Sequence, residues 1–180
     1  MALPGGVSVL ALVAVCTIGV GVLLHVIGLA TPNWSAISDK GFYRAYGLWK
    51  SCGGTIEAYD CDEYKFGNKF DESESSVKAC EAFAILGMLA SFLGLAMAAL
   101  SVLLPIIGKP KNAILPVIAL AGCVAAFICI LIAIVVWGAK VHAEYLSFLD
   151  IGYSFILSII GGILIVVGGV LAYIGNKRIS

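Results

Sequence analysis

Four long stretches of this chain carry no charged side chain, and they constrain the fold more than any other feature. They cover the segment before Asp39 and residues 82–108, 112–139 and 151–176. A helix needs about 20 apolar residues to cross the roughly 30 Å hydrocarbon core of a bilayer, and each stretch is longer than that. The chain is also 61% hydrophobic and only 12% charged over 180 residues, which leaves too few polar residues for the surface of a soluble domain. The sequence therefore predicts a membrane protein.

The expected fold is an all-α transmembrane four-helix bundle with a small extracellular antiparallel β-sheet, in one domain. The predicted spans are residues 7–30, 80–104, 113–137 and 153–173. Pro32 ends the first span, because the residue before a proline disfavours helical geometry. That span is too long for the apolar part of a signal peptide, and no basic residue precedes it, so we expect it to be retained. The extracellular segments are then residues 31–79 and 138–152.

The long first loop predicts the sheet. Aromatic and β-branched residues recur among polar ones in this loop, and in an extended strand Phe42, Arg44 and Tyr46 would lie on one face, with Tyr43 and Ala45 on the other. Gly53-Gly54 predicts a turn, and residues 55–59 suit a returning strand. The segment from Lys65 to Ser76 is polar and rich in turn-forming residues, so we predict it to be irregular.

Two cysteines in this loop indicate its location. Cys52 and Cys61 are separated by eight residues across the predicted turn, which favours a disulfide within a hairpin, and disulfides persist in the oxidising exterior. The loop is therefore placed outside the cell and both termini in the cytoplasm. Zinc binding is the alternative, but it needs further ligands and only Cys80 lies nearby. Cys80 is interpreted as a free or lipidated thiol at the membrane boundary, and the other cysteines as packing residues within helices: Cys16, Cys123 and Cys129.

The first loop also resembles the signature of the claudin superfamily, which includes the peripheral-myelin and epithelial membrane proteins and the calcium-channel γ/AMPA-receptor auxiliary subunits. The resemblance is carried by Trp34, Gly47-Leu48-Trp49, Cys52 and Cys61. It implies an extracellular sheet with four strands from the first loop and a fifth near the second. Glu81 stands where claudins usually carry an arginine. The final Ile179-Ser180 differs from the Tyr-Val ending that binds PDZ scaffolds, so no PDZ scaffold is expected as a partner. These departures indicate a divergent claudin, with an invertebrate origin as one interpretation.

The tryptophans of the first loop allow two interpretations. Trp34 and Trp49 either pack at the membrane interface and anchor the sheet to the helix ends or form a hot spot for a partner. Trp137, at the end of the third span, is expected to be an interfacial anchor. His25 is interpreted as a neutral, hydrogen-bonded imidazole. The glycosylation pattern at Asn33 abuts the first helix, where a glycan would collide with the membrane, so we expect it to be unused.

Acidic residues cluster around the second cysteine, at Glu57, Asp60, Asp62 and Glu63. They form either a solvated loop face or a negatively charged strand edge that attracts cations. The resemblance to claudins implies that the positions just after the second loop cysteine line a pore and influence its paracellular charge selectivity. Asp62 occupies that place in this chain, and the resemblance therefore makes it the main candidate for charge selectivity.

The leading functional hypothesis is a structural protein of cell–cell junctions in the plasma membrane. It would contribute to adhesion and to a paracellular barrier or a cation-favouring pore, with membrane lipids and the same or related proteins as partners. The alternatives are an auxiliary subunit of an ion channel or receptor, and a membrane organiser like the myelin and epithelial membrane proteins. His25 and His142 lie far apart in sequence, without a paired nucleophile. Since phosphate-binding and Cys-x-x-Cys motifs are also absent, neither an enzyme nor a metal or cofactor is expected. The zero net charge gives no reason to expect nucleic acid.

Overall fold

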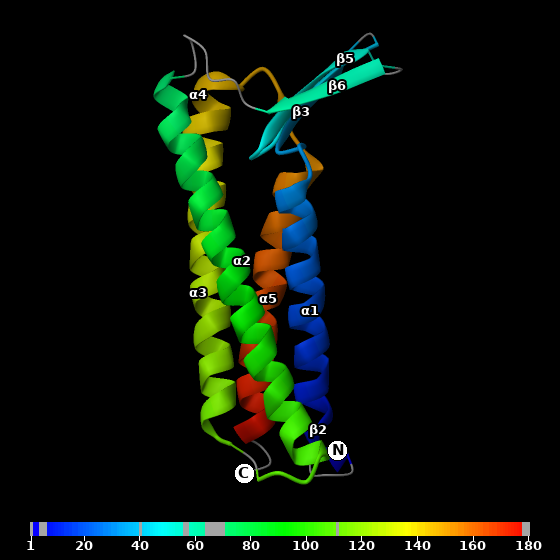
Figure 1. Cartoon of the computed structure of the whole chain (residues 1–180), viewed down its shortest axis with the longest axis vertical. Helices are drawn as coiled ribbons and strands as arrows, with labels where there is room; N and C mark the ends of the chain where they lie inside the picture. Colours follow the sequence, from blue (N-terminus) through cyan, green and yellow to red (C-terminus); the bar gives the residue numbers. More distant parts are fainter. Residues whose placement is uncertain are drawn as a thin grey trace.

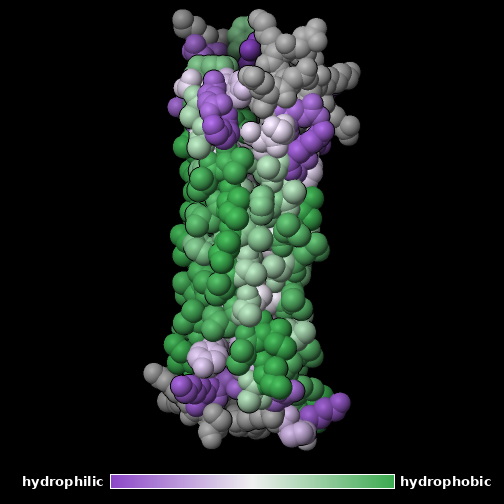
Figure 2. All heavy atoms as spheres, turned by 90° about the vertical axis from the view of Figure 1, so that its left-hand side faces the viewer, coloured by the Kyte–Doolittle hydropathy of each residue, from purple (hydrophilic) through white to green (hydrophobic). Residues whose placement is uncertain are grey.

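Four membrane-spanning helices form the body of the molecule (Figure 1). The computed structural model describes residues 2–3, 7–39, 41–55, 58–63, 71–110 and 112–177. Within them, the helices that are long and apolar enough to cross a bilayer are α1 (Val9–Ala30), α2 (Asp71–Ile106), α3 (Ile114–Val136) and α5 (Tyr153–Lys177). On the face shown in Figure 2, apolar residues form a continuous band between two polar ends. The predicted four-helix membrane fold is confirmed.

The second helix begins earlier than predicted. α2 starts at Asp71 rather than near residue 80, so part of the segment predicted to be irregular is helical. Its first turns are rich in acidic residues, which interact favourably with the positive end of the helix dipole. Glu74 and Lys78 also form an ion pair one turn apart on the helix surface, which stabilises a helix. The same polar composition that argued against a membrane span therefore favours a helix that extends outside the membrane.

The third helix also continues past its predicted end at residue 137. α3 leads directly into a π-helical segment, η1 (Trp137–His142), and then into the short α4 (Ala143–Tyr145). Figure 1 shows that α2 and the α3–α4 end both reach beyond α1 and α5 on the side where the sheet lies. The 36 residues of α2 measure about 54 Å at about 1.5 Å per residue, well beyond the roughly 30 Å hydrocarbon core. These two helices thus stand beside the sheet.

An antiparallel sheet of five strands sits over the ends of α1 and α5 (Figure 1). The first loop supplies β3 (Ser35–Asp39), β4 (Phe42–Tyr46), β5 (Lys50–Thr55) and β6 (Ala58–Glu63), and the second supplies β7 (Asp150–Ile151). The strand order is β6-β5-β4-β3-β7, with four strands from one loop and one from the other, as the family resemblance implied. A separate short hairpin, β1 (Ala2–Leu3) with β2 (Val7–Ser8), precedes α1.

The turn predicted at Gly53-Gly54 is wrong, because both glycines lie inside β5. Cys52 pairs with Cys61, and Thr55 pairs with Ala58. A turn at the two glycines would place Cys52 opposite residue 55. Cys52 and Cys61 are directly opposed and nine positions apart. The centre of the turn between them therefore falls between positions 56 and 57, which lie outside the described residues.

Close helix packing in the bundle depends on small residues. A stripe of small residues on α2 is buried: Gly87, Ser91, Gly94 and Ala98. α1 and α5 approach closely where Gly21 faces Gly161. A Cβ atom added at Gly161 would lie 2.7 Å from the carbonyl oxygen of Gly21 and 2.9 Å from the backbone nitrogen of His25. Because both atoms belong to the α1 backbone, no side-chain rotation would relieve the overlap.

We therefore expect Gly161→Ala to lower the free energy of unfolding by about 1–3 kcal/mol, the usual cost of overpacking. Gly19→Ala on α1 is the matched control, since an added Cβ there meets nothing within 4 Å. Alanine favours a helix over glycine by about 0.8–1.0 kcal/mol, so the control is expected to be neutral or slightly stabilising. Thermal unfolding of both full-length variants in the same detergent measures the difference, and equal melting temperatures would contradict the predicted backbone contact.

Candidate functional site

Trp34 lies at the centre of the junction between the sheet and the helices. Its side chain is only 1% exposed. Its ring centroid lies 5.3 Å from that of Trp137, at the start of η1, and 5.7 Å from that of Phe155 on α5. Such tilted and edge-to-face pairs are favourable aromatic contacts. The backbone of Trp34 also donates to the carbonyl of Tyr46 on β4 (2.9 Å) and accepts from the N–H of Gly152 (3.0 Å).

The tryptophans of the first loop also complete the hydrogen bonding of α1. The last four carbonyls of an α-helix have no partner within the helix. In α1, Thr31 donates to the carbonyl of Ile27 through both its N–H and its hydroxyl (3.0 and 2.7 Å). The indole N–H of Trp34 donates to the carbonyl of Gly28 (2.8 Å), and that of Trp49 donates to the carbonyl of Leu29 (2.7 Å). Of the two interpretations of these tryptophans, the contacts support anchoring of the sheet to a helix end.

The rest of the Gly-Leu-Trp motif has a structural role at the same junction. Leu48 is fully buried and belongs to the apolar cluster that contains Trp34, Trp137 and Phe155. A Cβ added at Gly47 would lie 2.4 Å from the Cα of Pro32. The motif thus combines a close backbone approach, a buried leucine and an indole that caps α1.

The expectation that Trp137 is an interfacial anchor is wrong. Its side chain is 1% exposed, so it has no access to lipid headgroups. It packs on Trp34, and its indole N–H donates to the Ser35 hydroxyl (3.2 Å). Ser35 is itself buried, and its hydroxyl lies 2.9 Å from Nδ1 of His142. The helix continues past Trp137, so this residue lies between helix and sheet rather than at a membrane-facing helix end.

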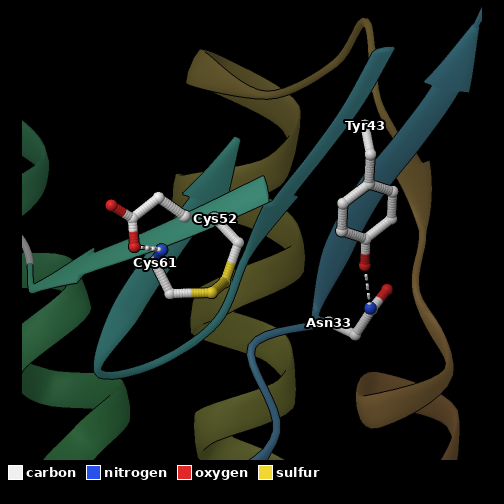
Figure 3. The surroundings of a disulfide bond; sticks show 5 residues. Asn33, Tyr43, Cys52 and Cys61 are labelled. Carbon is white, nitrogen blue, oxygen red and sulfur yellow. Dashed lines mark hydrogen bonds between the residues drawn. A yellow bond between two sulfur atoms is a disulfide. The ribbon is translucent and has the colours of Figure 1, made fainter. Parts of the chain in front are cut away.

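The predicted disulfide joins β5 to β6 (Figure 3). Cys52 and Cys61 are directly opposed, with their Cα atoms 4.1 Å apart. So short a distance is typical of a non-hydrogen-bonded pair, in which the backbone N–H of Cys61 points away from β5. The Asp60 carboxylate accepts a hydrogen bond from that N–H at 2.9 Å. β6 is the outer strand of the sheet, and Asp60 therefore satisfies a backbone donor that the edge would otherwise expose.

Three of the four acidic residues belong to β6, an edge strand of the sheet. Asp60 and Asp62 are both exposed on β6. Among the described residues, none forms a side-chain hydrogen bond or ion pair with Asp62. Glu63 ends β6, and only its backbone is described, whereas Glu57 lies outside the described residues.

The strand register places both aspartates on the face that carries Arg44. Asp60 is opposite Gly53, and Gly53 is opposite Arg44, so the two charged residues are two strands apart in one row. At about 4.8 Å per strand they are separated by about 10 Å. On this face β3, β4 and the loop before β7 line a groove of about 510 Å³, formed by Ile37, Asp39, Phe42, Arg44 and Phe148. The acidic edge thus borders an open, largely apolar groove.

Three other residues singled out from the sequence have structural positions. His25 is buried in the bundle, with its Nε2 3.2 Å from the carbonyl of Ala84. Cys80 is fully buried and donates weakly to the carbonyl of Ala133 (3.5 Å); it is a free thiol without the exposure that lipidation needs. The Asn33 amide nitrogen donates to the Tyr43 hydroxyl (Figure 3), which agrees with an unused glycosylation site.

The arrangement offers a fixed charged surface rather than a reaction centre. No group of three or more histidine, cysteine or acidic side chains is placed to hold a metal within the part of the chain that the structure describes. The disulfide and the indole caps hold the backbone that carries Asp62, so its charge has a defined position relative to the membrane. Sequence reasoning missed Ser35 and the structural role of His142, because an isolated serine and a lone histidine form no recognisable pattern.

Comparison with protein-family models gives a match over most of the chain. The model of the family described as PMP-22/EMP/MP20/Claudin matches residues 6–172, which is nearly the whole chain. A search against individual curated proteins finds no match.

Trp34→Phe tests the indole cap. Phenylalanine keeps most of the apolar contact but leaves the carbonyl of Gly28 without its donor, and a buried unpaired polar group costs about 1–3 kcal/mol. Trp49→Phe removes the equivalent donor at a half-buried position, where water can replace it, so we expect a smaller loss. Unfolding free energies of the two variants give the comparison, and a Trp34 effect no larger than the Trp49 effect would argue against a buried cap.

Removal of the disulfide is expected to destabilise the sheet. Cys52→Ser and Cys61→Ser should each lower surface delivery, and the double variant should be no worse than either single variant, because both remove the same bond. Closing a loop of this size contributes up to about 3 kcal/mol by chain entropy. Flow cytometry of an extracellular tag measures delivery, and additive losses would show that the cysteines act independently.

Proposed function

The chain belongs to the PMP-22/EMP/MP20/Claudin family, and from this membership we propose that it is a structural protein of cell–cell junctions. Members of this family are structural membrane proteins that associate within and between membranes. In the proposed role, the extracellular sheet contacts the same or related proteins in its own membrane and in the membrane opposite. The sheet projects from the bilayer beside the ends of α2 and α4 and is tied to the helices below it, as such contacts require.

The single observation that carries the proposal is the way in which the sheet is attached. It is tied to α1 by two indole hydrogen bonds, to α5 by the contact of Trp34 with Phe155, and to η1 by Ser35. A sheet this small has little core of its own, so these contacts determine its position. A protein that only anchored itself in lipid would not need an extracellular surface oriented in this way.

We further propose that the acidic face of this sheet favours cations along a paracellular path. Asp62 is exposed next to Cys61, and residues 31–81 include nine acidic and six basic residues. Fixed carboxylates beside a narrow aqueous path raise the local cation concentration, an effect that weakens beyond a Debye length of about 8 Å. Arg44, about 10 Å from Asp60 by strand spacing, is too distant to cancel the potential close to the strand edge.

The proposed location is the plasma membrane at cell–cell junctions, with both termini in the cytoplasm. The disulfide supports this orientation, because such bonds persist outside the cytosol. The sheet and the disulfide lie at the end of the bundle opposite to the N-terminus (Figure 1).

Asp62→Asn and Asp62→Lys test the charge proposal. In epithelial monolayers with equal junctional abundance, we expect Asp62→Asn to lower the sodium-to-chloride permeability ratio obtained from dilution potentials. Asp62→Lys should lower this ratio further or invert it, because it replaces a negative charge with a positive one.

Asp150→Asn is the matched control. It makes the same substitution in the same sheet, but on β7, the edge strand opposite to β6. The ratio is expected to change much less than with Asp62→Asn. Equal effects at the two edges would indicate a dependence on overall charge, and an unchanged ratio for both Asp62 variants would leave the acidic edge as a solvated surface.

A further inference from the structure

The Ser35 hydroxyl connects the extracellular sheet to the helix that stands beside it. Ser35 is the first residue of β3, and it pairs with Tyr46 on β4 and with Ile151 on β7. Its side chain is fully buried. The indole nitrogen of Trp137 lies 3.2 Å from the Ser35 Oγ, and Nδ1 of His142 lies 2.9 Å from it. One hydroxyl therefore joins three strands to both ends of η1.

The π-helical geometry makes this double contact possible. Trp137 and His142 are the first and last residues of η1. In an α-helix, two side chains five positions apart point about 140° away from each other. A π-helix has i→i+5 hydrogen bonds, which bring residues five apart to the same side. The wider turn thus brings an indole and an imidazole to a single hydroxyl group.

The donors and acceptors in this cluster are all satisfied in one tautomer of the neutral imidazole. An indole N–H only donates, so the Ser35 oxygen accepts from Trp137. When the imidazole proton is on Nε2, the Ser35 O–H donates to Nδ1 of His142. Protonation of the ring places a hydrogen on Nδ1, which then donates to the second lone pair of the hydroxyl, and the Ser35 O–H loses its acceptor. The Ser35 O–H has no other acceptor within the described residues, and a buried donor without a partner is unfavourable.

We propose that the contact of His142 with Ser35 is a pH-sensitive link between the extracellular sheet and η1, fully hydrogen-bonded when the imidazole is neutral and weakened when it is protonated. Imidazole is the side chain that ordinarily gains its proton between about pH 5 and 8. Stability contributed by the Ser35 O–H bond is then present at neutral pH and is lost as the exterior becomes acidic. The sheet would remain attached to α1 and α5 through Trp34 and Trp49 and to the start of η1 through Trp137, but its hold on the end of η1 at His142 would weaken.

The charged groups on the elements around His142 do not replace this partner. Lys140 and Glu144 lie on the same helical segment and pair with each other at 3.0 Å. α2 packs against η1; its acidic residues are Asp71, Glu72, Glu74 and Glu81, and Glu74 pairs with Lys78. The strands add Asp39 at the far end of β3 and the exposed Asp150 on β7. Among the described residues, the only side-chain hydrogen bond of His142 is to Ser35.

Hydrogen exchange of the full chain in lipid nanodiscs tests the proposal. Amides of β3 and β7 are measured at pH 7.5 and 5.5, with rates corrected for the intrinsic pH dependence of exchange. The wild-type sheet should exchange about tenfold faster at pH 5.5, the factor for loss of one buried hydrogen bond. His142→Asn offers a carboxamide oxygen near the position of Nδ1 that cannot titrate, so its exchange should stay slow at both pH values.

Two further variants complete the test. Ser35→Ala removes the link at any pH, so its exchange should be fast at pH 7.5 and should not rise further at pH 5.5. The chain has only two histidines, so His25→Asn, which alters the one inside the bundle, should retain the wild-type pH response. A wild-type sheet without acceleration at pH 5.5, acceleration that persists in both His142→Asn and Ser35→Ala, or acceleration that disappears in His25→Asn would each overturn the proposal.

Discussion

At the end next to the sheet, α1 leaves its last carbonyl oxygens without partners inside the helix, close to a membrane that supplies few hydrogen-bond donors. The first loop supplies the donors through the indoles of Trp34 and Trp49. An indole suits this place because it is a large apolar group with a single N–H, and it can be buried while it donates. The other contacts follow from the position of Trp34. Its ring contacts Trp137 and Phe155, and its backbone bonds the last residue of β4 and Gly152, just before α5. The sheet is therefore placed by a helix end that needs hydrogen-bond donors.

The number and approximate place of the membrane helices can be predicted from the sequence, because a bilayer requires a minimum length of uncharged residues that can be counted directly. The residues at which these helices begin and end are predicted poorly. Residues 71–79 are too polar to be read as membrane helix, yet they continue α2 because the helix does not end at the hydrocarbon boundary. The same reasoning placed a loop after Trp137, where η1 and α4 extend the third helix. Both errors have one cause. Hydropathy indicates where a helix leaves the hydrocarbon core, but the helix itself continues until its backbone hydrogen bonding ends.

In the site, local sequence patterns predict the cysteine pair correctly but misplace the hairpin turn and the surroundings of Trp137. The spacing of Cys52 and Cys61 is enough to predict the disulfide, whereas Gly53-Gly54 predicts a turn because glycine pairs usually mark one. The register shows that these glycines belong to a strand. Trp137 was assigned to the lipid interface because tryptophans gather there, and nothing in the local sequence indicates that Trp34 and Ser35, about a hundred positions earlier, cover it. The local pattern of apolar residues does not indicate contacts between distant segments, and these contacts decide whether a tryptophan faces lipid or protein.

The pairing of β3 with β7 has a consequence for the order of assembly. β4, β5 and β6 follow one another along the chain, so this part of the sheet and its disulfide can form as soon as the first loop has been translocated. β3 pairs Ser35 with Ile151, and β7 is synthesised only after α2 and α3. Strand β3 therefore keeps one edge open while two further helices are inserted. Until β7 arrives, a complete hairpin coexists with an unfinished sheet, and that interval is when a folding catalyst or a quality-control factor can distinguish nascent chains from finished ones.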